Sequence, residues 1–133
     1  MKRRALLSLV AGVPVGGCLG RQPLPRIAWI RLVNDRDEAY DVGVFVDADG
    51  EQVFSEQYHL GTTPDSATVL VESPVEGTGR YVVRADVDGQ IVSVDATRAV
   101  DGDENCVGVR FSLHRRGTLG HRTESMQECR ASP

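Results

Sequence analysis

Thiols and imidazoles are the groups in this 133-residue sequence best suited to chemistry, and each type occurs three times. No pair among them has the spacing of metal ligands, and the sequence contains no Cys-x-x-Cys motif. No serine lies in the Gly-x-Ser-x-Gly arrangement of a hydrolase nucleophile. We therefore expect no metal, no cofactor and no enzymatic activity. The remaining chemistry is covalent modification or pairing of Cys18, Cys106 and Cys129, with surface roles for His59, His114 and His121.

Cys18 follows a segment with the three parts of a secretory signal: basic residues 2–4, an apolar run at 5–13, and small residues at 15–17. The apolar run is shorter than the roughly 20 residues that cross a bilayer. The sequence Val-Gly-Gly-Cys at 15–18 resembles a lipobox, which implies that Cys18 becomes the first mature residue and carries a lipid. An ordinary cleaved signal with an incidental cysteine, or a short uncleaved anchor, is the alternative.

Arg3 and Arg4, followed by Leu6 and Leu7, indicate the export route. This arrangement resembles a twin-arginine signal, which exports proteins that have already folded. The general secretory route remains open, because paired arginines are common in basic segments. The sequence thus divides into a signal peptide at 1–17, a lipidated tether at 18–25, and a domain with a C-terminal tail at 26–133. The lipid would anchor that domain to the outer face of the cell membrane.

The charge balance is acidic and contains almost no lysine. Removing residues 1–17 takes away three of the 15 basic residues and none of the 19 acidic ones, so the net charge falls from −4 to −7. Lys2 is the only lysine, so every base of the mature chain is an arginine. This composition resembles that of proteins from extreme halophiles, although high-GC codon usage would also replace lysine. Nucleic acid is excluded as a partner, because it requires a basic surface.

Apolar and polar residues alternate with a period of two, which is typical of half-buried strands. Residues 27–33 are apolar on both faces except at Arg31, which predicts a central strand. No stretch of ten residues has helical periodicity. We expect seven strands, with 118–123 as the candidate for an eighth; the seven cover residues 27–33, 40–46, 53–60, 67–71, 81–87, 92–96 and 107–113.

The connections between these strands predict an all-β fold. Residues 47–50 and 86–89 contain Asp-Gly between apolar runs, a strong hairpin signal. Short strands with frequent turns favour a two-sheet sandwich of about seven to eight antiparallel strands. A twisted sheet folded into a small barrel is the alternative.

Residues 77–89 are Gly-Thr-Gly-Arg-Tyr-Val-Val-Arg-Ala-Asp-Val-Asp-Gly, and this pattern resembles a strand of immunoglobulin-like and fibronectin-like domains. The resemblance implies that Tyr81 lies at a corner and bonds back to the preceding loop. Together with the lipobox, the chain resembles small haloarchaeal lipoproteins with an immunoglobulin-like β-sandwich. Trp29 lies in the first expected strand, so the antibody-type tryptophan position is absent.

Cys106 and Cys129 remain after lipidation of Cys18, an even number in an oxidising compartment. Cys106 has the opposite parity to Val107 and Val109, so we expect it to point away from the core, where a returning C-terminal tail could reach it. Pairing would order that tail; two unpaired thiols are the alternative.

These observations favour a lipid-anchored surface domain that acts by binding or by structural display. The alternative is an accessory solute- or ion-binding lipoprotein of a transport system, which needs a concave pocket with converging polar groups. An envelope protein or a small solute would be the partner besides the membrane.

Overall fold

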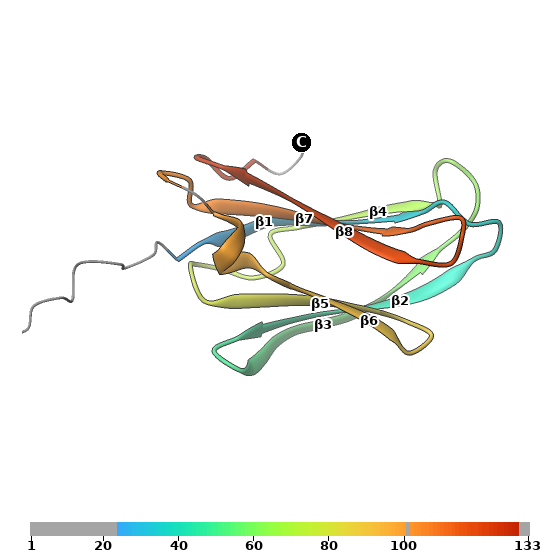
Figure 1. The fold of residues 1–133 in the computed structure, drawn as a ribbon, viewed down its shortest axis with the longest axis horizontal. Coiled ribbons are helices and arrows are strands. Elements are labelled where there is room, and N and C mark those ends of the chain that lie inside the picture. Colours follow the sequence, from blue (N-terminus) through green and yellow to red (C-terminus); the bar gives the residue numbers. More distant parts are fainter. Residues whose placement is uncertain (1–23, 101, 131–133) are drawn as a thin grey trace, which may run out of the picture.

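The chain folds into two four-stranded sheets that pack face to face, and a computed structural model describes residues 24–100 and 102–130 (Figure 1). A short 3₁₀ helix, η1 (Ala96–Ala99), follows the sixth strand. The strands are β1 (Arg26–Asn34), β2 (Tyr40–Ala48), β3 (Glu51–Leu60), β4 (Thr68–Glu72), β5 (Tyr81–Val87), β6 (Gln90–Asp95), β7 (Cys106–Leu113) and β8 (Leu119–Met126).

Sheet I has the strand order β4-β1-β7-β8, and sheet II has the order β3-β2-β5-β6. The predicted two-sheet sandwich is therefore confirmed, the eighth strand is present, and the barrel alternative is wrong. One detail differs: β1 and β7 run parallel, whereas the other five strand pairs are antiparallel. Alternation indicates which face a residue occupies and not the direction of its strand. The long connection through β2–β6 returns the chain to the same end of sheet I.

β1 lies between β4 and β7, as its apolar character on both faces predicts. Its register with β7 shifts between Ile27 and Trp29, and this β-bulge keeps both Ile27 and Ile30 in the core. On the outer face, Trp29 lies across Gly108 of β7, where an added Cβ would overlap the indole ring. Gly108 is therefore needed for this close approach.

The inner faces of both sheets meet in one hydrophobic core. Val42, Val44 and Val46 of β2 are completely buried, in agreement with the predicted alternation. β3 contributes little to the core apart from Leu60, since most of its residues are exposed at the edge of sheet II. The largest fully buried side chain is Phe111 of β7.

Both predicted Asp-Gly hairpins are present. Asp49 and Gly50 connect β2 to β3 with φ angles of 52° and 84°, and Asp88 and Gly89 connect β5 to β6 with 53° and 85°. Two successive left-handed residues define the turn type that matches the twist of paired strands. The Asp86 carboxylate also accepts a hydrogen bond from the backbone N–H of Gly89 at 2.9 Å.

Tyr81, the first residue of β5, forms the corner that the resemblance implies. Its hydroxyl lies 3.0 Å from the carbonyl oxygen of Glu76 and 2.9 Å from that of Gly77, and can donate to either. The ring is 4% exposed and belongs to the core. Its hydroxyl therefore connects the loop between β4 and β5 to the packed interior.

Candidate functional site

The export and anchor residues Arg3, Arg4 and Cys18 lie outside the residues that the structure describes. The description begins at Leu24, directly before β1. Across 24–100 and 102–130, no helical segment has the length and apolar character of a membrane span. Lipid attachment at Cys18 therefore stays a prediction.

Cys106 and Cys129 are joined in a disulfide, with their Cα atoms 5.3 Å apart. Cys106 begins β7 and projects from the outer face of sheet I, opposite to Val107, which lies in the core. Cys129 reaches it from the segment after β8. The bond fastens the C-terminal tail to the outer face of sheet I.

A second, small apolar cluster surrounds this disulfide on the outer face of sheet I. Ala28, Trp29 and Cys106 are buried there, and Leu70 and Met126 pack against them. An outer face of an antiparallel sandwich is ordinarily polar. Leu70 of β4 and Met126 at the end of β8 therefore cover apolar surface beside the disulfide that would otherwise be exposed to solvent.

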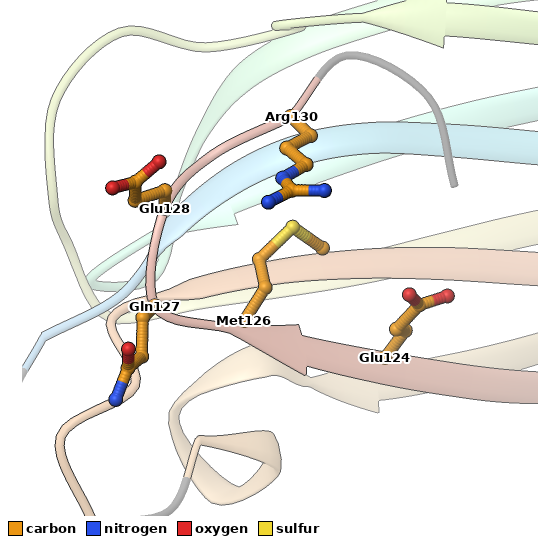
Figure 2. A pocket seen from close by; sticks show the side chains of 5 residues that line it. All are labelled: Glu124, Met126, Gln127, Glu128 and Arg130. Carbon is orange, nitrogen blue, oxygen red and sulfur yellow. The ribbon is translucent and has the colours of Figure 1, made fainter.

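A depression of about 370 Å³ lies beside this cluster and is lined by Glu124, Met126, Gln127, Glu128 and Arg130 (Figure 2). Figure 2 shows that Gln127 and Glu128 lie on one side of Met126 and Glu124 lies on the other, whereas the Arg130 guanidinium group points toward Met126. The polar groups do not converge on a common point. This depression is therefore a weak candidate for ligand binding.

The three histidines occupy two different surfaces. His59 of β3 places its Nδ1 2.8 Å from an Asp41 carboxylate oxygen across the β2–β3 pair, and both side chains are exposed. His114 and His121 lie together on sheet I. Groups of three or more metal-ligating side chains are absent from the described part of the chain.

Three arginines form a row across the outer face of sheet I. Arg31 of β1 is in register with Arg110 of β7, and Arg110 is in register with Arg122 of β8. Since strands lie about 4.8 Å apart, the three Cα positions span roughly 10 Å. Arg31 and Arg110 point outward, because their neighbours along each strand are in the core: Ile30, Leu32, Val109 and Phe111.

The arginine row has no carboxylate within ion-pair distance among the described residues. Elsewhere, Arg84 pairs with Asp47 at 3.2 Å and Arg98 lies 3.6 Å from Asp95. Like charges opposite each other destabilise a sheet. In addition, the Nε atoms of Arg31 and Arg110 are buried without a hydrogen-bond partner in the described part. The row therefore concentrates unneutralised positive charge on an otherwise acidic molecule.

A depression of about 290 Å³ adjoins two of these arginines and is lined by Asp35, Arg110, Ser112, His114, His121 and Arg122. We call it the distal depression, because Asp35 follows the end of β1 that is farthest from Arg26. Ser112 and Gly120 are opposite each other in the β7–β8 register, and an added Cβ at Gly120 would contact the His114 ring. The His114 ring therefore lies over Gly120, where a side chain would displace it.

The loops around the distal depression are held by two side chains. The Asn34 amide, 5% exposed, donates to the carbonyl oxygens of Glu38 and Gly61 at 2.8 and 2.9 Å. Arg36 donates to the carbonyl oxygens of His114 and Thr118 at 2.9 and 3.3 Å. The Asn34–Gly61 bond and both Arg36 bonds join chain segments that are distant in sequence, so they connect the loops at the distal end to one another.

Asp35, Arg110 and Arg122 are not among the functional residues expected from the sequence. Part of the signal was available, since Arg31 is the polar interruption of an apolar strand and Arg110 alternates with buried residues. The alignment of the three arginines depends on the parallel pairing of β1 with β7. Alternation within one strand contains no information about its neighbour.

The comparisons with known proteins agree with this architecture. A family model described as "Halobacterial Ig-like domain" matches residues 38–114, which run from just before β2 to just after β7. No curated protein and no solved structure matches the chain. β1, β8 and Cys129 lie outside the matched segment, although β1 and β8 complete sheet I. Because more than half of its residues are matched, the chain belongs to the halobacterial Ig-like domain family.

Proposed function

We propose that this protein is a lipid-anchored, non-enzymatic domain on the outer face of the cell membrane, where it acts by binding or structural display. The observation that carries the proposal is Cys18, which follows an export-type segment and precedes β1 by eight residues. The net charge of −7 after removal of residues 1–17 supports a location exposed to concentrated salt. Membership of an Ig-like family supports a surface or structural role.

The position of the tether determines which end of the domain would face outward. Residues 18–25 could span at most about 28 Å when fully extended. The nine residues of β1 lead away from that tether and rise by about 30 Å. The distal end would therefore point away from the membrane, with its loops connected to one another by Asn34 and Arg36.

Replacing the proposed lipidated residue tests the anchor. Cys18→Ser should move the protein from the membrane fraction into the medium, because the sandwich has no other proposed attachment. The native protein, extracted from membranes, should have the intact mass of residues 18–133 plus lipid. Cys129→Ser is the matched control, since it also removes a sulfur but should leave the protein in the membrane fraction. Unchanged fractionation of Cys18→Ser would refute the lipid anchor.

A second candidate function is that of an accessory solute- or ion-binding lipoprotein of a transport system. The observation that favours it is the distal depression, whose lining includes two arginines, two histidines, a serine and an aspartate. A flat and uniformly acidic surface would have counted against this role. Genes for a membrane permease beside the gene for this chain would support it.

A further inference from the structure

We propose that the distal depression is a binding site for inorganic phosphate, which Arg110 and Arg122 hold and Asp35 selects over sulfate. This proposal deepens the second candidate function and rests on it for any role in transport. Binding itself does not depend on the lipid anchor. Phosphate binding can therefore be refuted while the lipid anchor is confirmed, and the lipid anchor can be refuted while phosphate binding is confirmed.

The first argument is charge. Arg110 and Arg122 line the depression, Arg31 continues the row beside them, and no carboxylate neutralises any of the three within the described residues. A guanidinium group presents a planar set of donors that matches two oxygens of an oxyanion. A bound dianion would offset the repulsion between these neighbouring cations.

The second argument is burial. The Nε–H of Arg110 is buried without a partner in the described part of the chain, which costs free energy unless something accepts it. Arg110 is half-buried, so its charge is less screened by water than that of a fully exposed side chain. Because the Nε atom is itself inaccessible to solvent, the terminal NH2 groups of Arg110 would contact the anion, and the weakly screened charge strengthens that contact.

The third argument is size and polarity. The volume of about 290 Å³ is at the small end of the range for ligand pockets and has room for a tetrahedral ion together with several waters. Ser112 can donate a hydrogen bond through its hydroxyl, and His114 can donate through a ring N–H. His121 is in register with the core residue Phe111, so its ring belongs to the other face of sheet I. Oxygens not contacted by the arginines would therefore also find donors in Ser112 and His114.

Asp35 gives the site its selectivity. Its carboxylate lines the same depression and would repel an ion that offers only acceptor oxygens. At neutral pH, sulfate is such an ion, whereas hydrogen phosphate retains one P–OH group. That hydroxyl can donate to the Asp35 carboxylate, so the repulsion is replaced by a charge-assisted hydrogen bond. Phosphate monoester dianions lack this hydroxyl and should bind more weakly than inorganic phosphate.

Calorimetric titration of the detergent-extracted mature protein with inorganic phosphate tests the proposal. We expect one phosphate per chain, with binding retained in 1 M KCl, where the Debye length is only about 3 Å and long-range attraction is screened. Arg110→Gln and Arg122→Gln should each weaken binding by about tenfold or more. Sulfate and glycerol phosphate, titrated separately, should bind more weakly. Asp35→Asn should reduce the preference for phosphate over sulfate.

Arg80→Gln is the matched control, because Arg80 is exposed before β5 and lies outside the arginine row. It removes the same charge and should leave phosphate binding unchanged. Should Arg110→Gln fail to fold, Arg122→Gln on the edge strand β8 and Arg110→Lys keep the test available. The proposal is overturned if phosphate does not bind the native protein, if binding disappears in 1 M KCl, if sulfate binds equally well, or if Arg80→Gln weakens binding as much as Arg122→Gln.

Discussion

At the residue scale, the Tyr81 side chain contributes both to the packing of the core and to the position of a loop. Its ring fills part of the core, and its hydroxyl donates to the carbonyl oxygen of either Glu76 or Gly77. Burial raises the pKa of Tyr81 above the ordinary value of 10.0, and the nearby charge of Arg26 lowers it by a smaller amount. The pKa of Tyr58 is also raised, first by burial and then by Glu56. Since each phenol has a higher pKa in the folded chain than in the unfolded chain, loss of its proton favours unfolding.

Stability should fall as the pH rises above 10, where an unfolded tyrosine begins to lose its proton while the folded one keeps it. The stability is fully present below pH 10 and is lost as the pH passes the raised folded pKa. Tyr81→Phe should cost about 0.5–1.5 kcal/mol at neutral pH and reduce the alkaline loss. Urea unfolding at a series of pH values measures both effects. An alkaline loss identical to that of the native protein would contradict this account.

At the scale of elements, sheet I depends on strands that come from opposite ends of the chain. β1 and β7 form its centre, β8 forms one edge, and the disulfide attaches the tail that follows β8. Met126, the last residue of β8, packs against the second small cluster, which contains Trp29 and Cys106. The disulfide therefore fastens the tail beside an apolar patch on the outer face of sheet I.

Cys129→Ser should lower the free energy of unfolding by about 3 kcal/mol, because the bond between residues 23 positions apart constrains the unfolded chain. Cys129 is exposed, so its replacement leaves no cavity in the core. Limited proteolysis should then cut the chain after Met126. Reducing the native protein should produce the same loss, and an unchanged urea midpoint in both cases would contradict the prediction.

At the scale of the whole molecule, the charge is strongly unbalanced. The described residues contain two arginine–carboxylate ion pairs and the His59–Asp41 contact, which is an ion pair only when the imidazole is protonated. In two of these three contacts at least one partner is mostly exposed. Exposed pairs contribute at most about 1 kcal/mol each. After removal of residues 1–17 the net charge is −7, and repulsion among the excess carboxylates destabilises the folded state. Salt screening should therefore raise the free energy of unfolding, because it weakens the repulsion within the folded protein more than it weakens the ion pairs.

The free energy of unfolding should rise when KCl is increased from 0.1 M to 1 M, since the Debye length falls from about 10 Å to about 3 Å. Urea unfolding at each salt concentration measures the change. Sucrose is the control, because it stabilises by exclusion without screening charge. A fall in stability with KCl, or an equal rise with sucrose, would show that self-repulsion is not the main cause.

The sequence by itself determined the strands, their buried faces, both Asp-Gly turns, the central position of β1 and the outward direction of Cys106. These features are local, because side-chain alternation and turn chemistry act within a few residues. Only the tertiary structure decided that β1 runs parallel to β7 and that Arg31, Arg110 and Arg122 share one row. It also brought Asp35 to the same depression as His121. Strand neighbours are chosen by the packing of the whole core, which no single strand encodes.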